Sequence, residues 1–520
     1  MIKKIRQVLI IDFGSQYTQL IARKCRELAY SCEIVTVEDA KERFFHGRLP
    51  RAVILSGGPQ SIYEDNENYN FLFQNEKMPI LGICYGMQLL GHYFKGTVQK
   101  GKTFEYGRAL IFFLQDKFRF ANLPQTLDVW MSHADHVATI SDELEVVLKS
   151  SSGIVAGIRH KSRPILGLQF HPEVHHSQYG REIIEYFLKE MAHLQKDWSA
   201  DTIYLEIVEQ INAIKGKKVL CAFSGGVDSL VAAKLVAQVD PSNLFCFFVD
   251  HGLLRPQDYS HIKILMEQSG LNINIIDAKK LFFDKLALVG DPETKRKIIG
   301  STFIDVFQEK VVQFEKEHGI KFDLLLQGTL YSDVIESKSP HGKGGKSVTI
   351  KSHHNVGGLP DRMNIKLLEP LREIFKDEVR ALGKRLELPK RWIYRHPFPG
   401  PGIGIRVMGP ISEERVAIVQ QSDQIVLEEL EKFQLYDNVW QAFTVFLPVK
   451  TVGVKGDGRA YEEVVCLRIV NSVDGMTANW PDLPYNFLQT VSSRITNEVS
   501  GVTRVVYDIT SKPPGTIEWE

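Results

Sequence analysis

The sequence predicts an α/β protein, with two parallel-sheet α/β domains followed by a smaller α+β domain. Short apolar runs alternate with amphipathic stretches in the first part of the chain, and the same rhythm restarts after a polar segment. The last part instead mixes a long helical stretch, Glu413–Phe433, with strand-like runs. The chain has 520 residues. Since single hydrophobic cores stop growing at about 250–300 residues, we expect several domains.

Uninterrupted apolar runs indicate the strands of the first domain. Each run is short and is bounded by glycine, proline or charged residues, which is typical of strands buried on both faces of a mostly parallel sheet. The runs are Val8–Ile11, Ala52–Leu55, Ile80–Cys84 and Ile165–Phe170. The polar segment His193–Ala200 breaks the pattern, so we place the first domain at residues 1–195.

The second α/β domain opens with the apolar strand Lys218–Phe223, a helical pattern and another strand, Leu244–Val249. This βαβ order predicts a second parallel sheet. The segment Arg395–Gly402 is so rich in proline and glycine that it excludes regular structure. We therefore expect the second domain at residues 196–395 and the α+β domain at residues 396–520.

Composition and charge exclude several classes of protein. Lys and Arg total 63, as do Asp and Glu, so the formal net charge is zero and no global field favours nucleic acid or an anionic membrane. The first apolar run ends at Asp12, which predicts a strand and not a signal peptide, and no run approaches the roughly 18 residues of a membrane span. The six cysteines are scattered without a CxxC pair. This favours a reducing cytoplasm over a disulfide framework or a zinc site.

The segment Gly82-Ile83-Cys84-Tyr85-Gly86-Met87-Gln88 has the features of a nucleophile site. A lone cysteine is most often a core residue, but here a strand ends at Cys84, a helix follows, and glycines on both sides permit a sharp turn. A thiol at a helix N-terminus is favoured as thiolate. The N–H of Tyr85, with a second donor from the loop around Gly57, is placed to hold an oxyanion.

A base for this thiol is offered by His171-Pro172-Glu173, directly after the strand Ile165–Phe170. In an extended segment His171 and Glu173 point to the same side, so the carboxylate can hold the imidazole tautomer. The pattern GxCxGxQ with a downstream HPE resembles the class I glutamine amidotransferases over residues 1–195. The resemblance implies that Cys84, His171 and Glu173 form a triad that attacks the glutamine side-chain amide, forms a glutamyl thioester and releases ammonia.

The same resemblance implies that Gln88 and the segment Ser132-His133-Ala134-Asp135 help to hold glutamine. His133 precedes an aspartate and is an alternative base, but the HPE context favours His171.

A second motif, Ser224-Gly225-Gly226-Val227-Asp228-Ser229, follows the strand Lys218–Phe223. It lacks the Gly-Lys-Ser/Thr ending of a P-loop, yet its glycines let backbone N–H groups approach phosphates at a helix N-terminus. A capped helix start is the plain alternative. Asp250 ends the next strand, where open parallel sheets bind ligands, and this favours a nucleotide site. The expected ATP-binding residues are Ser224, Gly225, Gly226, Val227, Asp228, Ser229 and Asp250, with Asp228 also helping to place Mg²⁺.

This second site resembles the ATP pyrophosphatases, which cleave ATP to AMP and pyrophosphate while adenylating a substrate. Five further segments resemble the GMP synthetases in order along the chain: Val249–Arg255, Gln327–Ser337, Ser352–Pro360, Arg395–Gly402 and Lys512–Glu520. The resemblance implies that ATP adenylates the oxygen on carbon 2 of XMP and that ammonia from glutamine then displaces AMP to give GMP. It also implies a homodimer formed through the C-terminal domain.

Several further roles depend on this resemblance. Lys512, Thr516 and Glu518 match the XMP-binding terminus of the family, and Arg459 is placed to grip phosphate. A terminus with ligand contacts predicts that Glu520 is tied down. In the basic loop Ser337–Ser352, Lys338 is expected to contact ligand when the loop closes as a lid, with a solvated surface loop as the alternative. Lys295, Arg296 and Lys297 are expected on an exposed helix face.

Two other functions compete with this interpretation. A glutamine-dependent NAD synthetase is disfavoured because its glutaminase is of another type and its tail would lack Lys512–Glu520. A nucleotide-sensing protein with a dead glutaminase is disfavoured because a sensor needs no Cys84 nucleophile.

Overall fold

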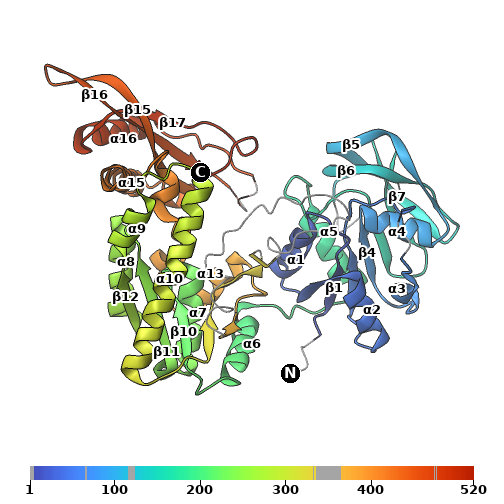
Figure 1. Cartoon of the computed structure of the whole chain (residues 1–520). Coiled ribbons are helices and arrows are strands. Elements are labelled where there is room, and N and C mark those ends of the chain that lie inside the picture. Colours follow the sequence, from blue (N-terminus) through green and yellow to red (C-terminus); the bar gives the residue numbers. More distant parts are fainter. Residues whose placement is uncertain are drawn as a thin grey trace. The chain divides into compact units, whose positions relative to one another are not determined.

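The computed structural model describes residues 5–64, 67–114, 123–331, 333–334, 365–472, 475 and 477–520, without the side chains of 102–104 and 455. The chain forms two compact units, Met1–Ile203 and Tyr204–Glu520 (Figure 1). Lys338 and its entire basic loop, Ser337–Ser352, lie outside the described residues. Within the described part, no helix is long and apolar enough to cross a membrane.

The first unit is built on one mixed sheet with the strand order β2-β1-β3-β4-β9-β8-β7-β5-β6. Its parallel half contains every strand expected from the apolar runs, and β1, β3, β4 and β9 are buried along their whole length. These parallel strands are β1 Val8–Ile11, β2 Cys32–Val35, β3 Ala52–Leu55, β4 Ile80–Ile83 and β9 Ile165–Leu168. The antiparallel strands are β5 Thr97–Phe113, β6 Thr126–Thr139, β7 Leu144–Ser150 and β8 Val155–His160.

A helix follows each parallel strand of the first unit, as α/β order requires. They are α1 Thr18–Glu27, α2 Val37–Phe45, α3 Asn70–Phe73, α4 Tyr85–Tyr93 and α5 Gly180–Tyr186, which continues as the π-helical turn η1 Phe187–Met191. Helix α4 packs against the sheet so closely that a Cβ on Gly167 of β9 would lie 2.9 Å from Met87 Cγ.

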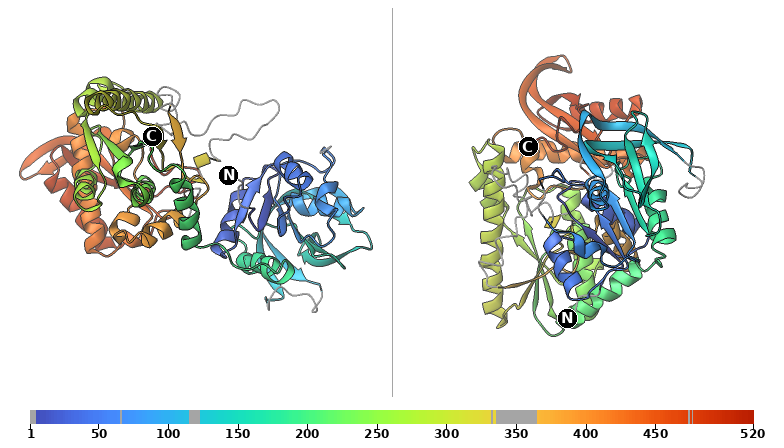
Figure 2. Two further views of the ribbon diagram at one scale, coloured as in Figure 1. Left: turned by 90° about the horizontal axis from the view of Figure 1, so that it is seen from below. Right: turned by 90° about the vertical axis from the view of Figure 1, so that its right-hand side faces the viewer.

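The second unit contains a fully parallel sheet with the order β12-β11-β10-β13-β14. Its strands are β10 Val219–Ala222, β11 Leu244–Asp250, β12 Ile273–Asp277, β13 Leu324–Leu326 and β14 Lys366–Leu368. Helices lie on both sides of this sheet (Figure 2), and the fold class expected for this part is confirmed. They include α6 Ala200–Asn212, α7 Val227–Val239, α8 Pro256–Gln268, α9 Lys279–Leu286, α10 Pro292–His318, α13 Lys376–Arg385 and α14 Lys390–Ile393.

The last part of the second unit is α+β, as expected. Strands β15 Gln441–Lys455 and β16 Gly458–Val470 form a long antiparallel hairpin, and β17 Val502–Tyr507 pairs with β16 in parallel. Two helices, α15 Glu413–Lys432 and α16 Tyr485–Glu498, pack beside this sheet. The 3₁₀ turn η3, Gly402–Arg406, follows the proline-rich segment.

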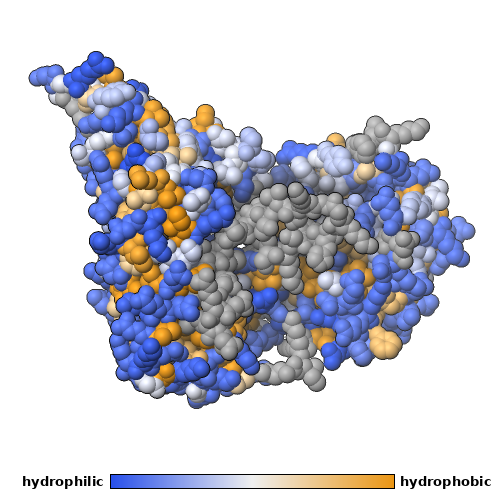
Figure 3. Space-filling model, in the orientation of Figure 1, coloured by the Kyte–Doolittle hydropathy of each residue, from blue (hydrophilic) through white to orange (hydrophobic). Residues whose placement is uncertain are grey.

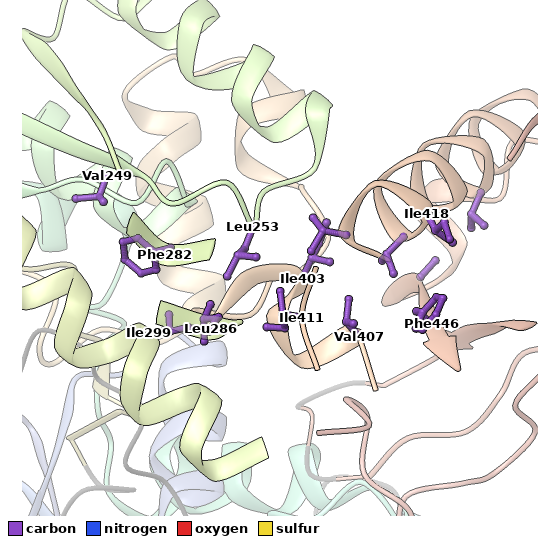
Figure 4. Packing of buried hydrophobic residues seen from close by; sticks show 14 of the residues in the cluster. Val249, Leu253, Phe282, Leu286, Ile299, Ile403, Val407, Ile411, Ile418 and Phe446 are labelled. Carbon is purple, nitrogen blue, oxygen red and sulfur yellow. The ribbon is translucent and has the colours of Figure 1, made fainter. Parts of the chain in front are cut away.

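One hydrophobic core joins the parallel sheet of the second unit to its α+β part (Figure 4). From the first come Val249, Leu253, Phe282, Leu286 and Ile299, and from the second come Ile403, Val407, Ile411, Ile418 and Phe446. The predicted boundary at residue 395 therefore separates two sheets that share a core, and the three-domain division stays a prediction. On the face in Figure 3, hydrophilic side chains interrupt the apolar ones.

Candidate functional site: a cysteine centre and a phosphate-binding loop

Cys84 occupies a sharp turn between β4 and α4. Its backbone has φ 52° and ψ −105°, a conformation that is costly for a residue with a side chain. The flanking glycines leave no room for a methyl group: a Cβ on Gly82 would lie 2.5 Å from the Gly86 carbonyl oxygen, and one on Gly86 would lie 2.5 Å from that of Leu55. Close backbone packing thus forces glycine on both sides of the thiol.

Neighbouring segments hold this turn from two sides. The Cys84 N–H donates to the Leu168 carbonyl of β9 at 2.7 Å, and the Gly86 N–H donates to the Ser56 carbonyl at 3.1 Å. Gly57 follows Ser56 and lies so close to the base that a Cβ there would be 3.2 Å from His171 Cε1. The expected oxyanion donors, the N–H groups of Tyr85 and Gly57, therefore belong to the two segments that meet beside Cys84.

His171 and Glu173 form a buried pair next to the thiol. His171 Nδ1 and Glu173 Oε1 are 2.7 Å apart, and both side chains are almost completely buried. Burial alone would lower the pKa of His171, but the Glu173 carboxylate and hydrogen bonds to Cys84 and Glu173 raise that pKa well above its usual value. The Tyr17 ring contacts the imidazole edge-on, with 4.9 Å between the two ring centroids. The geometry brings Cys84, His171 and Glu173 together as the motif predicted.

Two more of the predicted residues lie where β6 contacts Cys84 and α4. The Cys84 Sγ lies 3.8 Å from the Ser132 carbonyl oxygen, to which the thiol donates. Gln88 Nε2 donates to the Asp135 carbonyl at 2.8 Å. Strand β6 thus offers one backbone oxygen to the thiol and another to Gln88.

His133 is placed differently from its neighbour Ser132. It shares the buried face of β6 with Val129 and Met131, and its Nε2 lies 3.2 Å from Glu105 Oε2 on β5. Burial lowers the pKa of His133 against the opposing effect of Glu105. The described contacts of His133 are those of a core histidine paired across two strands.

Sequence analysis missed Gln169, whose Nε2 donates to Cys84 Sγ at 3.8 Å. The available signal was its position in the sequence, two residues before His171 and directly after the strand β9.

The loop Ser224–Ser229 connects β10 to α7 in the second unit. Ser224 Oγ lies 3.0 Å from Ser229 Oγ and accepts from the Gly226 N–H at 3.3 Å. Gly225 has φ +75°, and a Cβ there would lie 2.2 Å from Ile262 Cδ1. The loop is thereby folded back on itself at the N-terminus of α7, where backbone N–H groups favour anions.

Two lysines that sequence analysis did not name pair with the acidic residues of this edge. Lys376 Nζ donates to both carboxylate oxygens of Asp228, at 2.8 and 2.6 Å. Burial raises the pKa of Asp228, while Lys376 lowers it in part. Lys279 Nζ lies 3.1 Å from Asp250 Oδ2, and its hydrogen bond to Asp250 raises the pKa of Lys279. The carboxyl ends of β10 and β11 thus combine acidic residues with cations.

The C-terminal tail is held by a buried network. Glu518 accepts from Arg406 at 2.8 and 3.1 Å and from Gln441 at 2.8 Å. Lys512 Nζ donates to the Gly475 carbonyl at 2.7 Å, and Thr516 Oγ1 donates to the Glu518 carbonyl. Three of the predicted XMP residues therefore lie in one ordered segment.

The fourth, Arg459, lies elsewhere. It is next to the turn of the β15–β16 hairpin, opposite Val454, and is exposed.

Lys295 corrects the expectation of an exposed helix face. Its side chain is completely buried, and its Nζ donates to Glu520 Oε2 and to the Val407 carbonyl, both at 2.6 Å. Burial lowers the pKa of Lys295 and raises that of Glu520. The prediction failed because the partner comes from the chain terminus. The expectation that Glu520 is tied down is confirmed, and Lys297 is exposed as expected.

Comparison with known proteins identifies the family. The chain is 50% identical to the "GMP synthase [glutamine-hydrolyzing]" of Thermosipho melanesiensis, over 99% of this chain and 100% of that protein. This chain belongs to the glutamine-hydrolysing GMP synthase family. The GMP synthases of Thermotoga maritima and Aquifex aeolicus are 49% and 48% identical, each over 99% of this chain.

Three segments of the chain each match a known domain family. Residues 9–191 match "Glutamine amidotransferase class-I" and residues 428–519 match "GMP synthase C terminal domain". Residues 218–321 match "Phosphoadenosine phosphosulfate reductase domain". That last description concerns another activity, whereas the GMP synthases match along the whole chain.

Proposed function

We propose that this chain makes GMP from XMP, with glutamine as the nitrogen donor and ATP as the activating substrate. The observation that carries the proposal is the pairing, on one chain of this family, of a buried Cys–His–Glu centre with a separate phosphate-binding loop. The first releases ammonia and the second activates the atom that ammonia attacks. Neither site could make GMP without the other when glutamine is the nitrogen donor.

In the first half of the glutaminase reaction, the Cys84 proton passes to His171 and the thiolate attacks the side-chain carbonyl carbon of glutamine. The N–H groups of Tyr85 and Gly57 stabilise the oxyanion. His171 then gives its proton to the departing nitrogen, so ammonia leaves and a glutamyl thioester remains. The raised pKa of His171 suits this step, because the imidazolium beside Glu173 holds the proton until ammonia takes it.

Hydrolysis of the thioester reverses these roles. His171 takes a proton from water, the resulting hydroxide attacks the thioester carbon, and glutamate leaves as the carbon–sulfur bond breaks. The proton returns to the Cys84 sulfur. Glu173 keeps the imidazole in the tautomer that both halves need, through its 2.7 Å contact with Nδ1.

The second site binds the phosphates of ATP at Ser224–Ser229. Lys376 pairs with Asp228 of this loop and Lys279 pairs with Asp250 at the end of the neighbouring strand β11, so both add positive charge at this edge of the sheet. The XMP oxygen on carbon 2 attacks the α-phosphate, pyrophosphate leaves, and ammonia then displaces AMP from carbon 2. Adenylation is needed because AMP is a far better leaving group than the unactivated oxygen.

Magnesium carried by ATP fits this loop, since Asp228 sets a carboxylate beside the phosphate-binding N–H groups. The described residues contain no group of three or more His, Cys, Asp or Glu side chains able to hold a metal. Phosphate oxygens and water would therefore supply most of its ligands, as is usual for Mg²⁺. The ion, when bound, neutralises phosphate charge, and Asp228 must exchange its Lys376 contact to reach it.

We propose that Lys512, Thr516 and Glu518 contact XMP and that Lys338 belongs to a lid. A homodimer through the β15–β17 sheet is supported by exposed apolar side chains, because Val452, Val454 and Tyr461 are 45%, 78% and 62% exposed. Cross-strand register places them on one face of the hairpin. Arg459 is paired with Val454 on that same face.

If the dimer forms this way, Arg459 meets the partner subunit, and its part in XMP binding depends on that subunit's tail. A cytoplasmic location is supported by the six cysteines, all buried free thiols.

The test is a mass balance with XMP, ATP, Mg²⁺ and glutamine, in which AMP, pyrophosphate, GMP and ADP are all quantified. AMP, pyrophosphate and GMP formed in equal amounts, without ADP, support adenylation followed by amination. Ammonia release without XMP-dependent AMP would leave a glutaminase and overturn the synthetase proposal.

A further inference from the structure

Gln169 is a buried amide with no structural use for its hydrogen bonds. The residue is completely buried. Its Nε2 donates to the Cys84 sulfur, and its Oε1 has no hydrogen-bond partner among the described residues. Burying an amide whose hydrogen bonds are incomplete lowers the stability of the fold. An apolar side chain of the same size would not carry this cost. A residue that the fold does not need, but that touches the nucleophile, points to chemistry.

The backbone around Gln169 sets this contact rigidly. The Gln169 N–H donates to the Ala156 carbonyl at 3.0 Å, while the preceding Leu168 carbonyl accepts from the Cys84 N–H at 2.7 Å. Beyond β9 the chain bends at Gln169 and Phe170 and turns at Pro172 and Glu173. This path brings Gln169 and His171 to the Cys84 sulfur, and Glu173 contacts His171.

The contacts of the sulfur differ in which protonation state they favour. The Ser132 carbonyl can only accept, so it suits the thiol. The Gln169 amide N–H can only donate to sulfur, and hydrogen bonds to an ionised acceptor are stronger than those to a neutral one. His171 exchanges the proton between these states. Gln169 is thus a side-chain donor aimed at the thiolate.

We propose that Gln169 is a further catalytic residue of the glutaminase centre, whose side-chain N–H stabilises the Cys84 thiolate. The inference rests on the proposed function, in which Cys84 is the nucleophile. The contact acts twice: when the S–H proton has moved to His171 before attack on glutamine, and when the carbon–sulfur bond of the thioester breaks and its electron pair returns to sulfur. Gln169 itself exchanges no proton.

The test replaces the amide by a thioether of similar length in Gln169→Met. Because no described residue donates to Oε1, this change leaves no donor in that part of the chain unpaired. Alkylation of Cys84 by iodoacetamide, followed by mass spectrometry of its peptide, should slow about tenfold at pH 7, and its pH profile should move to higher pH. The kcat for glutamine should fall by about the same factor with little change in KM.

Two controls separate chemistry from folding. Gln125→Met makes the same replacement at an amide that donates to the Phe113 carbonyl, away from Cys84, and should alkylate like the wild type. GMP formation from added ammonium should be unchanged in Gln169→Met. If the Met variant does not fold, Gln169→Glu keeps the shape, puts a carboxylate beside the sulfur and should slow alkylation more strongly.

Wild-type alkylation rates in either folded Gln169 variant would overturn the proposal. A lower kcat with an unmoved alkylation profile would also overturn it, since that pattern indicates packing alone. If the wild-type enzyme itself makes no GMP from glutamine, the proposed function fails, while the alkylation comparison still decides the role of Gln169.

Discussion

Burial of His251 makes the stability of the second unit depend on pH. His251 follows Asp250 at the end of β11 and is 7% exposed. Its Nδ1 accepts from the Leu253 N–H at 3.1 Å, and a Cβ on Gly402 would lie only 3.1 Å from its Cε1. Burial lowers the pKa of His251 to about 4, with a smaller opposing effect from Asp250. Protonation would place a hydrogen where Leu253 already donates.

The direction and size of this pH dependence follow from the difference between the pKa values of His251 in the folded and unfolded chain. The pKa of an unfolded histidine is about 6.5, so between that value and about 4 the unfolded chain binds more protons at this position than the folded chain. Stability therefore falls as the pH falls through this window. For His251 the loss between pH 7 and pH 5 is about 2 kcal/mol.

The measurement is urea unfolding of the full chain at pH 7 and pH 5, for the wild type and for His251→Asn. Asparagine Oδ1 can replace Nδ1 as acceptor for the Leu253 N–H, and it does not titrate. The loss of unfolding free energy between the two pH values should be smaller in the variant by about 2 kcal/mol. His318→Asn, a change at an exposed histidine on α10, should leave the wild-type loss unaltered. Equal losses in the wild type and His251→Asn would refute the reasoning.

Three further substitutions test the two sites. Glu173→Gln removes the carboxylate from the imidazole and should lower glutamine-driven turnover by about 10²–10⁴-fold, while ammonium-driven turnover persists; equal losses of both would contradict this. Gly86→Ala places a Cβ 2.5 Å from the Leu55 carbonyl oxygen and should destabilise the first unit by at least about 2 kcal/mol in thermal unfolding. A wild-type melting curve would argue against that close packing. Lys376→Met removes the cation paired with Asp228 and should raise the KM for ATP about tenfold, whereas an unchanged KM would exclude a phosphate contact.

The parallel strands could be predicted from sequence because both of their faces are buried. Val8–Ile11 and Ala52–Leu55 are continuous apolar runs, and each forms a strand at those residues. The antiparallel half of the first sheet was not predicted. Strand β6 alternates buried and partly exposed residues, and β5 carries charged residues such as Glu105 within a long strand. A search for short, uninterrupted apolar runs does not detect such strands.

The cysteine centre could be predicted because its parts are local motifs at the ends of two paired strands. Cys84 follows β4 and His171 lies just beyond β9, and pairing of these strands brings the motifs together. Lys376 could not be found in this way, since it lies 148 residues from its partner Asp228. Lys295 was wrongly predicted for the same reason, because Glu520 lies 225 residues away. Long-range partners depend on packing that a local pattern does not contain.

Division of labour between the two sites is the central claim, and Cys84→Ala tests it most directly. The measurement is GMP formation by this variant with XMP, ATP and Mg²⁺, once with glutamine and once with ammonium as the nitrogen source. We predict that GMP forms from ammonium at close to the wild-type rate and that none forms from glutamine. GMP formation from glutamine would contradict the role of Cys84, and loss of the ammonium reaction would contradict the independence of the second site.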